Sequence, residues 1–173
     1  MHAMNPMSRR HCLHTLAALS AWPVAAQTTG PKRGSPPLQT PLSLPALPWL
    51  SGGVWTPDTA VGRVTVLYWW ASWCPICAAQ TPDMQALHAR HAEAGLSVVG
   101  LSVDRTFEAA QAHWQTQGWT FPSLWLAPTS RDTFTHLPSG VPSVWVFDRE
   151  QRLVQAYPGR LSRDQVQRLD RWL

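Results

Sequence analysis

The chain has 173 residues, of which 45% are hydrophobic and only 14% are charged. This apolar fraction excludes a disordered chain, and the length fits one domain with short appendages. The net charge is +4, but the basic residues are scattered and almost all are arginine, with Lys32 the only lysine. Because such charge forms no basic stripe, we expect no nucleic-acid partner.

The N-terminus has the pattern of an export signal. Arg9 and Arg10 precede a short, moderately apolar stretch that ends in small residues. Val24 and Ala26 fit the −3 and −1 positions of a signal-peptidase site, so residues 1–26 are predicted to be a signal peptide cleaved after Ala26. The Ser-Arg-Arg start is similar to a twin-arginine signal, which predicts a periplasmic protein. The general secretory route and a retained membrane anchor are the alternatives.

Prolines are concentrated just after this signal. Residues 27–41 are therefore predicted to be an extended, poorly packed linker, and the folded domain to cover residues 42–173. A hairpin that turns at Gly52 and Gly53 is expected near the start of that domain.

The domain alternates between predicted strands and helices. Apolar and β-branched runs predict five strands: residues 63–70, 96–103, 121–126, 143–147 and 152–157. Composition and capping residues predict three helices: residues 75–94, 106–117 and the end of the chain after Ser162. Residues 127–140 are expected to be a polar loop. The order predicts an α/β fold with a central mixed β-sheet flanked by helices on both faces.

Cys74 and Cys77 lie where a predicted buried strand turns into a helix. Cys74 falls at the helix N-terminus, where unpaired N–H groups and the helix dipole favour a thiolate, and Pro75 suits the first helical turn. Cys77, one turn further in, can reach the Cys74 sulfur but is screened by the helix and sheet. This predicts that Cys74 attacks a substrate sulfur and that Cys77 resolves the mixed disulfide. Once Cys12 leaves with the signal, the mature chain has no other cysteine.

A metal site is the competing interpretation of these cysteines. A zinc-finger-like series, C-x2-C-x10-H-x2-H, is formed by four residues: Cys74, Cys77, His88 and His91. Its gaps are too short for the usual finger, and a continuous helix would carry the histidines about 15–20 Å from the cysteines. We therefore expect no metal and no other cofactor, and we expect solvated histidines on a helix face.

Residues 68–77, Tyr-Trp-Trp-Ala-Ser-Trp-Cys-Pro-Ile-Cys, resemble the active-site segment of thioredoxin-like proteins, in particular the exported TlpA/ResA-type thiol-disulfide oxidoreductases. Pro82 lies where that family kinks its active-site helix, and Gly140-Val-Pro142 precedes a strand as the family's cis-proline loop does. The resemblance covers roughly residues 40–173. It implies a thioredoxin-like fold with a redox-active disulfide between the two cysteines.

The resemblance also implies a substrate-binding surface. The Val141–Pro142 peptide bond is expected to be cis and to lie against Cys74, with the Val141 backbone pairing with a substrate's extended chain. A trans proline that starts an edge strand is the alternative. The expected substrate contacts also include the residues around the nucleophile: Trp73, Pro75 and Ile76.

Two positions depart from the family pattern. Tyr68 stands where thioredoxin carries a buried aspartate, and Gln80 stands where the exported branch often has a glutamate. Those acids help to move protons at the buried cysteine. Their replacement leaves the direction of electron flow open at this point.

The function implied by the resemblance is a periplasmic reductase of protein disulfides that acts by dithiol exchange, in cytochrome c or envelope protein maturation. The expected partners are protein disulfides or dithiols and a membrane electron donor, and a monomer is expected. Two alternatives use the same cysteines: an oxidant that donates its disulfide, and a copper- or haem-site assembly factor that binds metal or apoprotein. A peroxidase is disfavoured because nothing resembles the Thr-x-x-Cys turn of that class.

Overall fold

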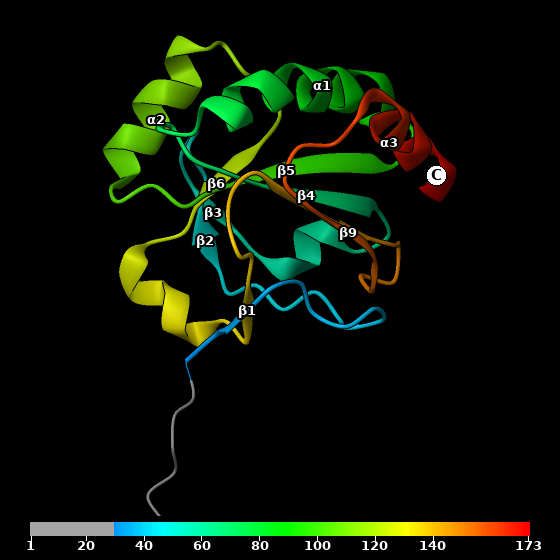
Figure 1. The fold of residues 1–173 in the computed structure, drawn as a ribbon, viewed down its shortest axis with the longest axis horizontal. Helices are drawn as coiled ribbons and strands as arrows, with labels where there is room; N and C mark the ends of the chain where they lie inside the picture. The colour runs from blue at the N-terminus through cyan, green and yellow to red at the C-terminus, as the bar shows by residue number, and fades with distance from the viewer. Residues whose placement is uncertain (1–29) are drawn as a thin grey trace, which may run out of the picture.

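A five-stranded sheet with the order β6-β5-β4-β8-β9 forms the centre of the molecule (Figure 1). The computed structural model describes residues 30–173, so the predicted signal peptide, residues 1–26, lies outside the described residues. The strands of this sheet are β4 (Val64–Trp70), β5 (Leu96–Ser102), β6 (Ser123–Trp125), β8 (Ser143–Phe147) and β9 (Leu153–Pro158). Strands β4, β5 and β6 run parallel, while β8 and β9 join as antiparallel neighbours, which gives the predicted mixed sheet.

Strand β4 is the central strand and is buried over its whole length. Its near-continuous apolar sequence reflects this position, because a strand covered on both faces has no solvent side. It pairs with β5 from Val64 opposite Leu96 to Trp70 opposite Ser102. The carboxyl ends of β4 and β5 therefore meet at one edge of the sheet, and the loop that leaves β4 there leads to Cys74.

Three α-helices lie on one face of the sheet: α1 (Pro75–His91), α2 (Phe107–Thr116) and α3 (Arg163–Gln167) (Figure 1). The crossovers β4-α1-β5 and β5-α2-β6 step across the sheet in the same direction. Right-handed crossovers then place both helices on the same side. The sequence predicted helices on both faces. Among residues 30–173, the helices on the opposite face are two short 3-10 helices, η1 (Pro57–Ala60) and η2 (Pro128–Thr133).

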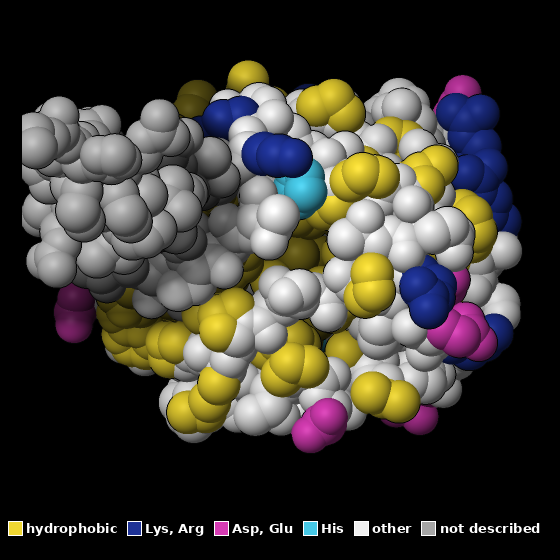
Figure 2. Space-filling model, turned by 90° about the horizontal axis from the view of Figure 1, so that it is seen from below, with side chains coloured by type: hydrophobic (Ala, Val, Ile, Leu, Met, Phe, Trp, Pro, Cys, Tyr) yellow, Lys and Arg dark blue, Asp and Glu magenta, His cyan; other side chains and the backbone are white. Residues whose placement is uncertain are grey.

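The sheet separates two hydrophobic clusters, because successive side chains of a strand point to opposite faces. Tyr68 and Trp70 of β4 pack in the cluster under the α-helices, whereas Leu67 and Trp69 pack in the cluster on the other side. Seen from below, that other side shows hydrophobic side chains around a hollow near its centre (Figure 2). The clusters together bury both faces of the central strand.

Residues 32–42, which we call the N-terminal strap, pair with the domain, whereas the sequence predicted a poorly packed linker there. Strand β1 (Lys32–Arg33) is parallel to β7 (His136–Leu137). Further along, the Gln39 N–H donates to the carbonyl of Leu153 at 2.7 Å. The prolines permit this because an edge segment leaves half of its N–H groups unpaired in any case.

The predicted polar loop over residues 127–140 is also more structured than expected. It contains η2 and β7. Its two large apolar side chains, Phe134 and Leu137, are buried in the cluster on the side of the sheet opposite the α-helices, which we call the lower cluster. Two isolated apolar residues in a polar stretch give no periodic signal. They anchor the loop that leads to Val141.

The remaining elements follow the sequence prediction closely. The first hairpin, β2 (Leu47–Pro48) and β3 (Val54–Trp55), has Gly52 and Gly53 at its turn, both with positive φ. The last helix begins with a capping box at Ser162, and α3 continues as the 3-10 helix η3 (Arg168–Trp172). Within residues 30–173, no helix combines the length and the hydropathy needed to cross a membrane.

Candidate active site

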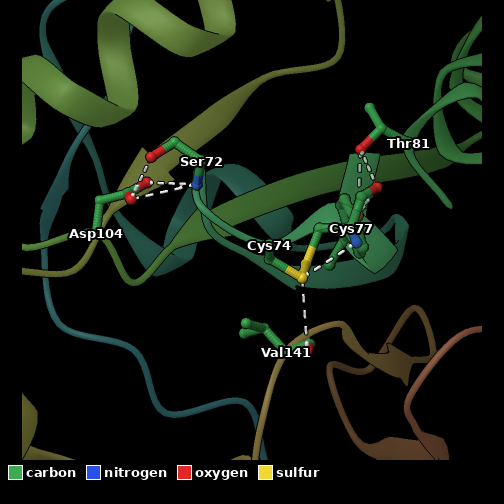
Figure 3. The surroundings of a disulfide bond; sticks show 7 residues. Ser72, Cys74, Cys77, Thr81, Asp104 and Val141 are labelled. Carbon is green, nitrogen blue, oxygen red and sulfur yellow. Dashed lines mark hydrogen bonds between the residues drawn. A yellow bond between two sulfur atoms is a disulfide. The ribbon is translucent and has the colours of Figure 1, made fainter. Parts of the chain in front are cut away.

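A disulfide joins Cys74 and Cys77 at the N-terminus of α1, with their Cα atoms 5.2 Å apart (Figure 3). Cys74 is the N-cap residue, and the backbone N–H of Cys77 donates to its Sγ at 3.1 Å. Pro75 can occupy the first helical position because a helix leaves that N–H unpaired. The helix thus directs an otherwise unpaired N–H group to the sulfur of Cys74, where negative charge is stabilised.

The two sulfurs differ in access to solvent. Cys74 is 5% exposed and Cys77 only 1%, whereas Trp73 is 65% exposed and Ile76 54%. Pro75, between them, is exposed as well. The structure therefore places both cysteines below a rim of apolar side chains, with Cys74 slightly the more exposed residue of the two.

The loop before β8 lies directly against this disulfide. The Val141–Pro142 peptide bond is cis, as predicted from the resemblance, so the alternative of a trans proline is wrong. The carbonyl oxygen of Val141 is 3.6 Å from Cys74 Sγ (Figure 3). Pro142 is buried and Val141 is half-buried. After reduction, the Cys74 thiol can donate a hydrogen bond across this short gap.

Tyr68 lies under the second cysteine. Its hydroxyl donates to the carbonyl of Cys77 at 3.0 Å, and the Thr81 hydroxyl donates to the same oxygen at 2.8 Å. Burial raises the pKa of Tyr68 to about 12, against a smaller opposing effect of its hydrogen bond with Thr81. The phenol is therefore neutral at physiological pH, where it fixes the backbone of Cys77 and cannot act as a base.

Gln80 occupies the second position that departs from the family pattern, and both ends of its amide are hydrogen-bonded. Its Oε1 accepts the N–H of Leu161 at 2.6 Å, and its Nε2 donates to Asp83 Oδ2 at 3.1 Å. The side chain is completely buried. It connects α1 to the segment before α3 and offers no proton acceptor to Cys77.

Asp104, a buried acid, lies beside the site. It is not among the residues predicted from the sequence. Its carboxylate accepts hydrogen bonds from the Ser72 hydroxyl at 2.7 Å and from the Ser72 N–H at 3.1 Å (Figure 3). It also accepts one from the Ser102 hydroxyl at 2.7 Å. It is only 1% exposed. An acidic residue just after a buried strand was the available signal, because that strand ends beside the loop that carries Cys74.

The two histidines of the zinc-like series are not brought to the cysteines. His88 and His91 lie in the last turn of α1, and the cysteines lie at its start. His91 Nε2 is instead 3.0 Å from Asp170 Oδ1. Among residues 30–173, no group of three or more His, Cys, Asp or Glu side chains is placed to hold a metal ion.

The fold and the site together define a thioredoxin-like protein with a Cys-x-x-Cys disulfide at a helix N-terminus, facing a cis-proline loop. The sequence profile of the AhpC/TSA family matches residues 46–157. The chain belongs to that family.

This chain matches its curated relatives over only part of their length. The chain is 42% identical over 45 residues to the thiol-disulfide oxidoreductase ResA of Oceanobacillus iheyensis. This matched segment covers 26% of this chain and 23% of that protein. It is 25% identical over 109 residues to the thiol:disulfide interchange protein HelX of Rhodobacter capsulatus, covering 63% of this chain and 60% of HelX.

Solved structures show the same fold. A DsbF homologue from Corynebacterium diphtheriae superimposes with a TM-score of 0.68 at 21% identity, covering 83% of this chain and 100% of that one. The thioredoxin domain of a thiol-disulfide oxidoreductase from Bacteroides vulgatus gives 0.68 at 15% identity, covering 79% and 98%. Likeness at this level of identity supports the architecture and leaves the activity to the chemistry of the site.

Proposed function

We propose that the protein is an exported thiol-disulfide oxidoreductase that reduces protein disulfides through Cys74 and Cys77. The observation that carries the proposal is the asymmetry of the two sulfurs. Cys74 Sγ accepts the helix N–H at 3.1 Å and lies 3.6 Å from the Val141 carbonyl, while Cys77 is closed off behind it. The names of ResA and HelX, which describe thiol-disulfide chemistry, support the same reaction class.

The reaction begins with both cysteines reduced. The Cys74 thiolate attacks one sulfur of a substrate disulfide, and the other substrate sulfur leaves as a thiolate that takes a proton from solvent. Cys77 then loses its proton and attacks the Cys74 sulfur of the mixed disulfide. This releases the second substrate sulfur and closes the Cys74–Cys77 disulfide, so two electrons pass to the substrate.

The surface around the disulfide suits an extended polypeptide. Trp73, Pro75 and Ile76 present exposed apolar area, and the Val141 backbone lies beside Cys74. A substrate chain can pair with that backbone as an added strand while its cysteine meets Cys74. We place the substrates among disulfides of envelope proteins or apocytochromes c, with a membrane dithiol donor to restore the reduced state.

The two residues between the cysteines favour reduction over donation of a disulfide. A strongly stabilised thiolate makes a protein oxidising, and strong stabilisation requires several donors or a positive charge. Pro75 and Ile76 supply neither, and the hydrogen bond to Cys74 comes from the Cys77 N–H. We therefore assign a reducing role. Export rests on the signal pattern of residues 1–26.

Cysteine variants test this proposal directly. Cys74→Ser should abolish disulfide exchange, whereas Cys77→Ser should accumulate mixed disulfides with its partners because the resolving thiol is missing. The measurement is non-reducing electrophoresis after acid trapping, with mass spectrometry of the adducts. In the reduced wild-type protein, alkylation near pH 6 should label Cys74 before Cys77.

Two results would contradict the assignment. Faster alkylation of Cys77 than of Cys74 would reverse the roles of the two sulfurs. Stoichiometric loss of both reactive thiols on addition of Cu(I), together with no exchange in either direction, would instead support a metal-assembly factor.

A further inference from the structure

A cleft of about 190 Å³ opens beside the disulfide. Trp73 and Val141, the residues that flank Cys74 in sequence and in space, both line it, and so does the segment 137–140. An extended chain advances about 3.3 Å per residue. A residue within about two positions of a substrate cysteine held at Cys74 can therefore reach this cleft past Trp73 or Val141.

The charged side chains that line the cleft are both cationic. Arg33 comes from β1 and Arg131 from η2. Neither forms an ion pair with another of the described residues. Arg131 donates through Nη2 to the carbonyl of Val103 at 2.7 Å, which holds the guanidinium at the end of β5. Its Nε is buried and has no hydrogen-bond partner in residues 30–173.

A second buried donor lines the same cleft. Trp69 is fully buried, and its indole Nε1 also has no acceptor among the described residues. Asp104 follows the cleft residue Val103 in sequence. Its carboxylate already accepts hydrogen bonds from Ser72 and Ser102. The described residues therefore place two cationic side chains and no ion-pairing carboxylate on the wall of the cleft, which suits a ligand that carries negative charge.

We infer that this cleft binds a carboxylate of the substrate, and that the protein prefers disulfides with an acidic side chain within two residues of the attacked cysteine. An arginine guanidinium matches a carboxylate with two parallel hydrogen bonds, and Arg33 adds charge at the rim. The inference rests on the proposed function, because the cleft selects substrates only if Cys74 exchanges with them.

Matched peptide disulfides test the preference. Each pair carries glutamate or glutamine at the second position before or after the cysteine, and the rate of reduction by the full-length mature protein gives kcat/KM. We expect the glutamate peptide of at least one pair to react about fivefold faster, the size of a partly exposed ion pair. The ratio should fall towards one as salt is raised.

Arginine variants assign the preference to the cleft. Arg131→Gln and Arg33→Gln should each lower the glutamate-to-glutamine ratio, and Arg131→Lys should retain part of it because the charge is kept. Arg168→Gln is the matched control, since Arg168 is exposed on η3 and removing it changes the net charge equally. The control should leave the ratio as in the wild type.

Each remaining outcome counts against a particular claim. Equal kcat/KM for both members of every pair, with exchange still lost in Cys74→Ser, would overturn the cleft inference alone. Absence of exchange with every peptide would overturn the proposed function. A ratio of one for peptides, combined with an Arg131-dependent preference for glutathione disulfide over hydroxyethyl disulfide, would assign the cleft to a small thiol and overturn its assignment to acidic protein segments.

Discussion

At the scale of single residues, the loop before Cys74 depends on a carboxylate that contacts no sulfur in the site. Asp104 accepts hydrogen bonds from the N–H and hydroxyl of Ser72 and from the hydroxyl of Ser102, and all three donors face a nearly inaccessible charge. Hydrogen bonds to a buried charged acceptor are stronger than neutral ones. The position of the loop is therefore tied to the charge of one side chain.

Asp104→Asn should lower the free energy of unfolding by about 2 kcal/mol. The NH2 group of asparagine would replace a carboxylate oxygen that accepts a hydrogen bond, so a donor would face a donor. Urea denaturation followed by fluorescence measures this loss. Disulfide exchange should slow as well, since Ser72 would no longer be held. Asp132→Asn, at an exposed acid of η2, is the control, and equal losses in the two variants would contradict the role of Asp104.

The residues that the sequence could predict are those whose signal is local. Cys74, Cys77 and Pro142 belong to short motifs at a strand–helix junction and at a strand start, so their places followed from spacing and from resemblance. Asp104 and Arg131 could not be predicted in the same way. Their partners, Ser72 and Val103, come from other segments of the chain. The position of Asp104 after a buried strand is a weak signal, and Arg131 in a polar loop has none.

At the scale of elements, the far end of α1 contains a group whose titration affects the fold. Burial lowers the pKa of His88, and the positive charge of Arg63 lowers it further. In the unfolded chain a histidine takes up a proton near pH 6.5. The unfolded state therefore binds more protons than the native state just below that pH, so the native state loses stability as the pH falls.

We expect the free energy of unfolding to decrease as the pH falls from about 6.5 through the lower pKa of folded His88. His88→Gln removes the titrating group, so this part of the pH dependence should be weaker in the variant. Chemical denaturation at intervals between pH 7 and pH 5 compares the two slopes. Identical slopes would show that the environment of His88 does not contribute.

Element types were predictable from the sequence, but the side on which each helix packs was not. Residues 63–70 and 75–94 were assigned correctly in kind, and the helix ends at His91, a few residues early. The placement of α1 and α2 on one face depends on strand order, and apolar periodicity carries no information about that order. Strand order combined with crossover handedness gives the observed arrangement.

At the scale of the whole molecule, the N-terminal strap closes the lower side of the sheet. The Leu42 N–H donates to the carbonyl of Gln151 at 2.7 Å, and Leu153 donates to Thr40 at 2.9 Å. Pro41 also pairs with Arg152 as an isolated bridge. These contacts extend the folded unit beyond the predicted start of the domain at residue 42.

Truncation measures what the strap contributes. A protein that begins at residue 43 should melt about 5 °C below one that begins at residue 30, because it loses several backbone hydrogen bonds worth about 1 kcal/mol each before entropy is considered. A protein that begins at residue 36 lacks only the β1–β7 pairing and should fall between the two. Differential scanning calorimetry gives the comparison, and equal melting temperatures would restore the assignment of this segment as a linker.

The strap also sets an order for folding. Its partners, β7, Gln151 and Leu153, lie more than a hundred residues later in the chain. Closing so long a loop carries an entropic cost, and the hydrogen bonds to Gln151 and Leu153 offset it only once the β8–β9 hairpin that carries these residues has formed. We therefore expect the first described segment to be synthesised to be among the last to be fixed, with the lower cluster uncovered until then along the rim that the strap occupies.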